Sequence, residues 1–307
     1  MPALLDHRFL FVVGKGGVGK TTVSAALGLA AARKGKRVLI AMTNVKERLS
    51  QLLEVPPIQD EVVRVAPNLD AVNMTPTKAL EEYGLMILKV KTVYKAVFEN
   101  RFVRAFLRGT PGLEAWTMLG KAYFHAVGHG PDGRGDYDLV ILDAPATGHG
   151  LDMLRVPQVI VNVAPPGLLR REAERALALF RDPERAGAVL VALPEDMPTN
   201  ESIELHQALE NELSIHVPAL VVNQLLPKLF EPAEREVLRN LPSQLDEDSP
   251  IATLARAGRI RSLREGVQDE SLKRLKEAID VPRIALPHLF AAEFGRSHVE
   301  SLSQAFG

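Results

Sequence analysis

Short apolar runs alternate with segments of helical spacing along most of the chain. The apolar runs have the length of buried strands, and we expect strands at Phe9–Val13, Arg37–Met42, Tyr137–Leu142, Val159–Val163, Ala188–Leu193, Ala219–Val222 and Arg283–Leu286. The segments between them predict helices at Val23–Arg33, Leu168–Phe180, Ser202–Leu213, Glu231–Asn240, Ser249–Arg264 and Glu270–Ile279. This alternation predicts an α/β fold, a doubly wound and mostly parallel sheet with helices on both faces.

Residues 75–127 depart from this alternation, because their pattern is helical and contains no obvious strand. Two short extended candidates, Val62–Val65 and Leu69–Met74, precede them. We therefore expect a small helical subdomain inserted at about residues 75–127. No linker-like composition and no internal repeat divides the chain further, so residues 1–307 are interpreted as a single domain.

Composition narrows the class of protein. Hydrophobic residues make up 46% and charged residues 24% of the 307 residues, as in soluble globular proteins. A net charge of −1 provides no overall attraction to nucleic acid or to anionic membranes, so nucleic-acid binding is not favoured. The first residues show no signal region, and no run approaches the roughly 18 apolar residues of a membrane span. We expect a cytoplasmic protein without a transmembrane segment.

A glycine-rich segment lies between the first predicted strand and the first predicted helix. Its residues are Gly14, Lys15, Gly16, Gly17, Val18, Gly19, Lys20, Thr21 and Thr22, which satisfy the P-loop spacing G-x-x-x-x-G-K-[ST]. Glycines let several backbone N–H groups converge on a phosphate at a helix N-terminus. Lys20 is expected to reach the β- and γ-phosphate oxygens of ATP, and the Thr21 hydroxyl to bind Mg²⁺. The segment predicts a P-loop NTPase.

A second candidate for the metal follows a later strand. Asp143 comes directly after the apolar residues Leu139–Leu142, where a carboxylate can hold Mg²⁺ opposite Thr21. A lone aspartate at this position is more often a turn or cap residue, but the complete P-loop favours the metal role. Gly148 is expected near the γ-phosphate. His149 has two equally weighted interpretations, a phosphate contact and a helix cap.

Several segments together resemble the ArsA family of P-loop ATPases, which includes arsenite-pump ATPases and the factor that delivers tail-anchored membrane proteins. Lys15 resembles the family's signature lysine, and Asp143 with Thr147-Gly148-His149 resembles its D-x-x-x-T-G-H segment. Two more stretches resemble family motifs, Leu193–Glu201 (L-P-E-x-M-x-x-x-E) and Val221–Gln224 (V-V-N-Q). The resemblance extends over nearly the whole chain.

The resemblance implies a dimeric ATPase that uses ATP and Mg²⁺, with Lys15 reaching the nucleotide of the partner subunit. It also implies that Asn223, Gln224 and Pro287 contact adenine, because an amide offers both a donor and an acceptor. The partner is expected to be a second copy or a related ATPase. An unknown protein client is expected to bind through residues 75–127.

One position departs from the family pattern. Asn44 stands after the second strand, where the family has an aspartate that is implicated in activating the attacking water. An amide can orient water but cannot accept its proton. We therefore assign Lys15, Lys20 and Asn44 as candidate catalytic residues of a switch ATPase. The alternative is a hydrolysis-deficient regulatory subunit, which could pair with an active paralogue; a MinD/ParA-like membrane or DNA positioning ATPase is less favoured.

The absence of cysteine removes two activities of the family. Arsenite binding by thiolates and a C-x-x-C zinc clasp both need sulfur ligands, so neither is expected. His125 and His129 have a spacing of four residues that could place both on one helix face. We interpret them as a helix-end pair in preference to metal ligands, because Gly128 lies between them and no accompanying glutamate or cysteine is near.

An aromatic stripe marks the candidate client region. Tyr94, Phe98, Phe102 and Phe106 recur every four residues and would lie along one side of a continuous helix. Such a stripe is more often the core of a subdomain, and its other interpretation is a groove for a client helix. The sequence leaves both open.

Overall fold

The computed structural model describes residues 3–43, 46–88, 112–128, 135–241 and 249–307. Within these ranges eight strands form one sheet in the order β3-β4-β2-β5-β1-β6-β7-β8. The strands are β1 (Phe9–Val13), β2 (Val38–Thr43), β3 (Val63–Ala66), β4 (Leu69–Met74), β5 (Leu139–Asp143), β6 (Ala186–Ala192), β7 (Ala219–Leu225) and β8 (Arg283–Pro287). Among the strand pairs only β3–β4 is antiparallel. The predicted α/β fold with a mostly parallel sheet is confirmed.

The central strands are apolar except for Thr43 and Asp143 at the carboxyl ends of β2 and β5, because helices cover both faces of the sheet. All five residues of β1 are buried, and β1 pairs with β5 on one side and with β6 on the other. Phe9 and Phe11 point into one hydrophobic core, whereas Leu10 and Val12 point into the other. One strand thus contributes to both layers, as expected of a doubly wound sheet.

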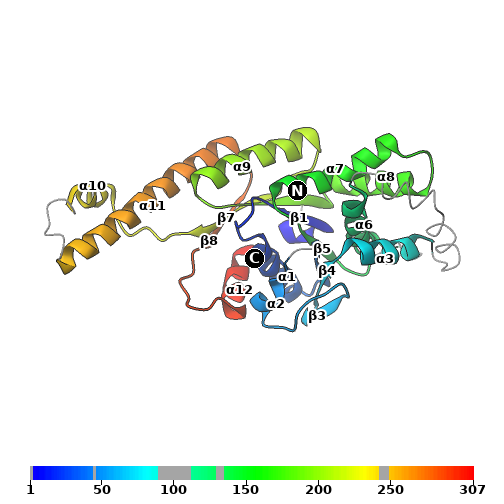
Figure 1. Ribbon diagram of the computed structural model, residues 1–307, viewed down its shortest axis with the longest axis horizontal. Coiled ribbons are helices and arrows are strands. Elements are labelled where there is room, and N and C mark those ends of the chain that lie inside the picture. The colour runs from blue at the N-terminus through cyan, green and yellow to red at the C-terminus, as the bar shows by residue number, and fades with distance from the viewer. Residues whose placement is uncertain (1–2, 44–45, 89–111, 129–134, 242–248) are drawn as a thin grey trace.

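Each core has its own set of helices (Figure 1). The first face is covered by α1 (Lys20–Arg33), α2 (Leu49–Leu53) and α12 (Arg296–Ser303), with the short helices η1 (Leu4–Asp6) and η4 (Gln304–Phe306) at its edge. The second face is covered by α3 (Pro76–Leu88), α6 (Leu113–Val127), α7 (Thr147–Val163), α8 (Leu168–Phe180) and α9 (Asp196–Gln207), which continues as a π-helical turn, η2 (Ala208–Glu212). No helix in the described ranges has the length and apolar character needed to span a bilayer.

The described helices of the region 75–127 share the core of the sheet. Tyr83 of α3 contacts Trp116 of α6 edge to face, and both side chains belong to the core that also contains Phe9 and Phe11. These helices are therefore held to the sheet by the same apolar cluster as α7 and α8. The stripe of Tyr94, Phe98, Phe102 and Phe106 lies outside the described residues.

Two expectations about secondary structure are wrong. The run Val159–Val163 is the last part of α7 instead of a strand; Val159 and Val163 are exposed there while Ile160 is buried, a helical pattern. Packing on the core has overridden the β-branched preference of the run. The separate helices at Ser249–Arg264 and Glu270–Ile279 are one continuous helix, α11 (Pro250–Ala278), since Gly266 and its neighbours do not interrupt it.

A long arm extends from the sheet. It consists of the loop 226–231, helix α10 (Pro232–Asn240) and α11. We call the described residues between 226 and 278 the arm. Figure 1 shows α10 and the first half of α11 projecting well beyond the end of the sheet, whereas the second half of α11 lies beside α9.

Candidate functional site: a phosphate-binding loop at the carboxyl edge of the sheet

The glycine-rich segment follows β1, in the middle of the sheet. Gly14 adopts φ 154° and lies so close to the Val191 carbonyl oxygen that a Cβ would overlap it. Gly19 has φ 91°, immediately before the first residue of α1, and a Cβ there would overlap the Asn223 amide. Glycine is thus required at both positions by backbone conformation and by close approach. The loop ends at the N-terminus of a buried helix, which is the environment that favours a bound phosphate.

Lys20 folds back over this loop. Its Nζ donates to the carbonyl oxygens of Gly14 and Lys15, both at 3.0 Å. Burial lowers the pKa of Lys20, and the nearby Asp143 carboxylate opposes this shift. The ammonium therefore lies inside the cradle formed by Gly14–Gly19. This position fits the expected role of Lys20 toward the phosphates of a nucleotide.

Asp143, at the carboxyl end of β5, lies against the first turn of α1. Thr21 Oγ1 donates to Asp143 Oδ2 at 2.6 Å, and Ser24 Oγ donates to Oδ1 at 3.3 Å. The side chain is buried, which raises the pKa of Asp143 to about 6, although the bonds from Thr21 and Ser24 act in the opposite direction. A hydroxyl and a carboxylate held together are hard oxygen ligands, and they fit Mg²⁺. Ser24 is absent from the motif and was missed by sequence reasoning.

Lys15 points to a different partner. Its Nζ lies 2.7 Å from Glu201 Oε1 in α9, and both side chains are partly exposed. Glu201 is the last residue of the L-P-E-x-M-x-x-x-E stretch, and the sequence alone assigned it no contact. The two lysines of the loop are therefore in different environments, with Lys20 turned inward and Lys15 held outward by another element.

The adenine candidates lie at the carboxyl ends of β7 and β8. Asn223 Nδ2 donates to the Val18 carbonyl oxygen at 2.8 Å, and Asn223 Oδ1 accepts from the Gln224 N–H at 2.9 Å, so Asn223 ties β7 to the glycine loop. Gln224 adopts φ 57° beside a pocket of about 210 Å³. The pocket is lined by Thr22, Asn223, Gln224, Pro287, His288, Leu289, Phe294 and Leu302. The structure thus brings Asn223, Gln224 and Pro287 together beside Thr22 of the phosphate loop.

The segments that contain Asn44 and Gly148 lie only partly within the residues that the structure describes. Asn44 lies outside the described residues; nearby, Glu47 accepts hydrogen bonds from Ser50 N and Ser50 Oγ, both at 2.6 Å, and so stabilises the start of α2. Gly148 lies in the first turn of α7 with open space where a Cβ would be. The backbone of His149 lies in the same turn of α7.

The structure describes only the first residue of the predicted histidine pair, His125. His125 Nδ1 lies 3.0 Å from Asp136 Oδ2, and His129 lies outside the described residues. Among the described residues, no three histidine, aspartate or glutamate side chains are grouped so that they could hold a metal ion.

Comparison with known proteins agrees with this geometry. A family model described as anion-transporting ATPase matches residues 7–164 and 169–239. The chain is 26% identical over 299 residues to the ATPase BagA of Mycobacterium tuberculosis, covering 91% of this chain and 87% of that relative.

Two other relatives are similar over more than two thirds of this chain. The arsenical pump-driving ATPase of Escherichia coli is 28% identical over 265 residues, which cover 77% of this chain and 44% of that relative. The ATPase ASNA1 homolog of Entamoeba dispar is 26% identical over 271 residues, which cover 72% of this chain and 77% of that relative. Because the family model matches well over half of the chain and the P-loop lies within the match, the chain is an ATPase of the ArsA family.

Proposed function

We propose that this ATPase is an MgATP-dependent dimeric switch that couples its nucleotide state to the binding of a protein partner. The proposal rests on the arrangement of the two lysines of the phosphate loop. Lys20 lies within the cradle, whereas Lys15 extends away from it to Glu201. A cation that is not used to hold phosphate within its own subunit is available to a nucleotide held by a second copy.

The residues of the site divide the work as follows. The backbone of Gly14–Gly19 and the Lys20 ammonium hold the phosphates, while the pocket beside Asn223, Gln224 and Pro287 receives the base. Thr21 and Asp143 would hold Mg²⁺, which neutralises charge on the phosphate oxygens when it is bound. Lys15 leaves Glu201 and neutralises charge that develops on the partner's nucleotide, so binding and dimerisation are linked.

The experiment compares Lys15→Ala with the wild type and with Lys34→Ala, which removes an exposed lysine at the end of α1. We expect Lys15→Ala to abolish ATP-induced dimers in sedimentation velocity. Phosphate release should fall on the order of 10³-fold, as when a charge supplied by a partner is removed. Nucleotide binding by the monomer should remain within about threefold, because Lys20 still holds the phosphates. Unchanged dimers and unchanged turnover in Lys15→Ala would reject the switch.

A second function is favoured by one residue. Asn44 replaces the aspartate expected at the attacking water, and this favours a nucleotide-binding regulatory subunit with little hydrolysis, alone or paired with an active paralogue. Single-turnover hydrolysis by the purified protein, measured beside Asn44→Asp, separates the two functions. Activity that arises only in Asn44→Asp supports the regulatory subunit, and robust wild-type turnover excludes it.

We place the partner site in the region 75–127 and the protein in the cytoplasm. The aromatic residues Tyr94, Phe98, Phe102 and Phe106 are the candidate client contacts. A positioning ATPase of the MinD/ParA type is the alternative, and co-sedimentation with liposomes or DNA, with and without ATP, tests it. If the protein pellets with liposomes or with DNA in an ATP-dependent way, the positioning ATPase replaces the protein-client proposal.

A further inference from the structure

The loop between β8 and α12 borders the pocket beside the phosphate loop. Residues 288–295 follow Pro287, the last residue of β8, and lead into α12; we call them the β8–α12 loop. His288, Leu289 and Phe294 of this loop line the pocket of about 210 Å³, as does Leu302 of α12. Thr22 of the phosphate loop lines the same pocket, so a group bound there adjoins the phosphates in the cradle.

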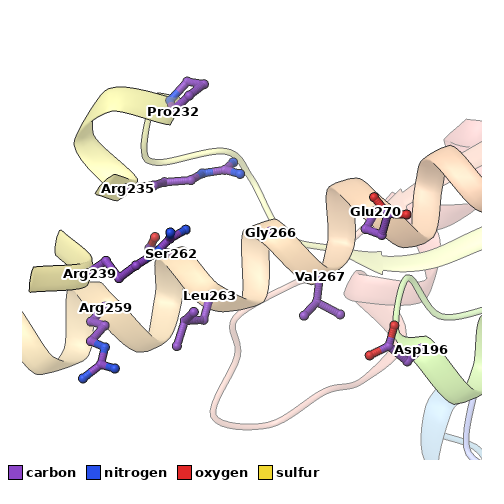
Figure 2. Close-up of a pocket in the computed structure, with 10 residues that line it drawn as sticks. All are labelled: Asp196, Pro232, Arg235, Arg239, Arg259, Ser262, Leu263, Gly266, Val267 and Glu270. Atoms are coloured by element: carbon purple, nitrogen blue, oxygen red, sulfur yellow. The ribbon is translucent and has the colours of Figure 1, made fainter. Parts of the chain in front are cut away.

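A larger cavity lies elsewhere in the molecule. Figure 2 shows this groove of about 490 Å³, and all ten of its lining residues belong to α9, α10 and α11. None of them is part of the phosphate loop or of the β8–α12 loop. Of the two cavities, the smaller is therefore the one that suits a group attached to a bound phosphate.

Phe294 presents an aromatic ring to the smaller pocket. Its ring is stacked on that of His298, with 5.0 Å between the centroids and 25° between the planes. His298 Nδ1 accepts from Gly295 N at 3.2 Å, which fixes the imidazole at the start of α12. Phe294 is 39% exposed, although its side chain is large and apolar. A ring that lines a pocket and remains partly exposed offers a surface on which a nucleobase stacks.

Glu54 holds the end of the β8–α12 loop from a distant part of the chain. Its Oε1 accepts from Arg296 N at 3.1 Å, so the carboxylate lies at the N-terminus of α12, where the helix dipole favours negative charge. The same oxygen lies so close to Gly295 that a Cβ would overlap it. Glycine is required at 295 by this close approach alone, because its φ of −140° is open to any residue. We call the contact between Glu54 and Arg296 N the anchor.

The anchor extends from the end of α2. Glu54 follows this helix directly, with a left-handed φ of 55° and with its N–H bonded to the Ser50 carbonyl oxygen. This conformation is uncommon for a residue that has a side chain. Leu53 of α2 and Val299 of α12 belong to the same hydrophobic core, and the two helices are in contact. The anchor thus supplements an apolar contact between α2 and α12.

We propose that Glu54 is a positioning residue for nucleotide binding, which anchors the β8–α12 loop so that Phe294 stacks on the nucleobase. Phe294 lies two residues before Arg296, so a bond at Arg296 N restrains the backbone that carries the ring. This inference rests on the proposed binding of the base in the pocket beside Gln224 and Pro287.

The anchor also connects the two ends of the nucleotide site. The segment that leads to Glu54 leaves β2 after Thr43, and β2 pairs with β5 so that Met42 lies opposite Asp143. Asp143 is the proposed Mg²⁺ ligand, whereas Phe294 lies at the pocket for the base. One stretch of chain, residues 43–54, therefore runs from the phosphate end of the site to the element that holds its base end.

Two ligands separate the base from the phosphates in the test. Calorimetric titration with Mg²⁺ compares a slowly hydrolysed ATP analogue with inorganic tripolyphosphate, which has no base. We expect Phe294→Ala to bind the analogue about 5- to 150-fold more weakly, the loss of one stack between a base and an aromatic ring. Its affinity for tripolyphosphate should stay within about twofold, because the cradle is unchanged. Phe290→Ala is the matched control, since Phe290 is in the same loop and 72% exposed but does not line the pocket.

Glu54→Ala tests the anchor itself. We expect this variant to bind the analogue about two- to tenfold more weakly, the range of one net hydrogen bond, and tripolyphosphate as tightly as the wild type. Glu54→Gln keeps an acceptor oxygen and should restore most of the affinity. Added to Phe294→Ala, Glu54→Ala should cause no further loss, because the ring that it positions is gone. Glu61→Ala, which removes an exposed glutamate further along the same segment, serves as the control.

The outcomes distinguish the anchor from the pocket. Normal analogue binding by Phe294→Ala would overturn the stack and with it the inference. A loss in Phe294→Ala without one in Glu54→Ala overturns the anchor and leaves the pocket for the base intact. Equal losses of analogue and tripolyphosphate in Glu54→Ala indicate a general effect on the fold and also overturn the anchor.

The wild type tests the pocket on which the inference rests. If it binds the analogue no more tightly than tripolyphosphate, the base contributes nothing and the proposed pocket fails together with the anchor. Sedimentation velocity of the wild type with the analogue measures dimerisation separately. A failure of the dimeric switch therefore leaves the comparison between Glu54→Ala and Glu61→Ala valid.

Discussion

At the scale of residues, the two lysines of the phosphate loop have the same side chain but different surroundings. Lys20 lies inside the loop on two backbone carbonyl groups, and burial lowers its pKa. Lys15 is bound through a partly exposed ion pair to Glu201. In the proposed dimer this ion pair must open before Lys15 reaches the nucleotide of the other subunit, so Glu201 would compete with that nucleotide.

Glu201→Gln should therefore favour the ATP-induced dimer. A partly exposed ion pair contributes about 0.2–1 kcal/mol and a symmetric dimer opens two of them, so their removal should tighten dimerisation by roughly 2- to 30-fold. Sedimentation equilibrium at several protein concentrations with the ATP analogue measures the change. Glu204→Gln is the control, because it removes the same charge from an exposed position one turn further along α9. Equal dimer affinities in the two variants would show that Glu201 does not restrain Lys15.

The glycines of the loop permit a second comparison at this scale. Gly17 and Gly19 both have positive φ, 88° and 91°, but a Cβ meets nothing within 4 Å at Gly17 and overlaps Asn223 at Gly19. Gly17→Ala should cost only about 1 kcal/mol of stability for its left-handed backbone. Gly19→Ala should cost more and also abolish nucleotide binding, because Asn223 is displaced. Denaturant unfolding measures the loss of stability, and calorimetric titration with ATP measures the loss of binding. Equal losses in the two variants would contradict the role assigned to the close approach of Gly19 and Asn223.

At the scale of elements, the helices are defined more by what they pack against than by their own preferences. The β-branched run that ends α7 is helical because Ile160 packs into the core. In α11 the polar side chains of Glu265 and Gln268 are buried, because they satisfy the backbone groups of the loop 226–230. Neither outcome follows from the local period of hydrophobicity.

Gln268→Ala tests how the root of the arm is held. The substitution leaves the Leu226 N–H and C=O without their partner, which costs about 1–3 kcal/mol for each buried group that water cannot reach. We expect a lower urea midpoint and a weaker response of dimerisation to ATP. Lys273→Ala, at an exposed position of α11, serves as the control. A Gln268→Ala protein as stable as this control would mean that the loop is fixed by other contacts.

At the scale of the whole molecule, one sheet with a core on each face holds the site. β1 lies between β5 and β6, so the loop after β1 meets Asp143 from one neighbour and Val191 from the other. The helices α3 and α6 complete the core on one face, and His125 lies near the end of α6. Global stability therefore depends on groups that are remote from the nucleotide site.

His125 predicts a dependence of stability on pH. Burial lowers the pKa of His125 below its ordinary value of 6.5, although the bond to Asp136 acts in the opposite direction. A lowered folded-state pKa means that the contribution of neutral His125 is present above pH 6.5 and is lost as the pH falls through the folded value. The free energy of unfolding of the wild type relative to His125→Gln should therefore decrease between pH 7.5 and pH 5.5, by at most about 1.4 kcal/mol per pH unit. The same difference at both pH values would contradict this.

Sequence reasoning found the central strands, the phosphate loop and the family, because each is specified by the spacing of residues that are near one another in the sequence. It missed Ser24 and Glu201, since neither belongs to a motif with an assigned contact. It also divided α11 and assigned a strand to the end of α7, where packing overrode local preference.

The sequence by itself determined that a strand, a glycine turn and a helix succeed one another at residues 9–33, because steric limits on the backbone act between neighbours. Only the tertiary structure decided what this loop faces. Thr21 meets Asp143 across 122 residues of chain, and Lys15 meets Glu201 in α9, because the order of strands brings separate carboxyl ends to one edge. Strand order depends on the packing of two cores, which no short pattern specifies.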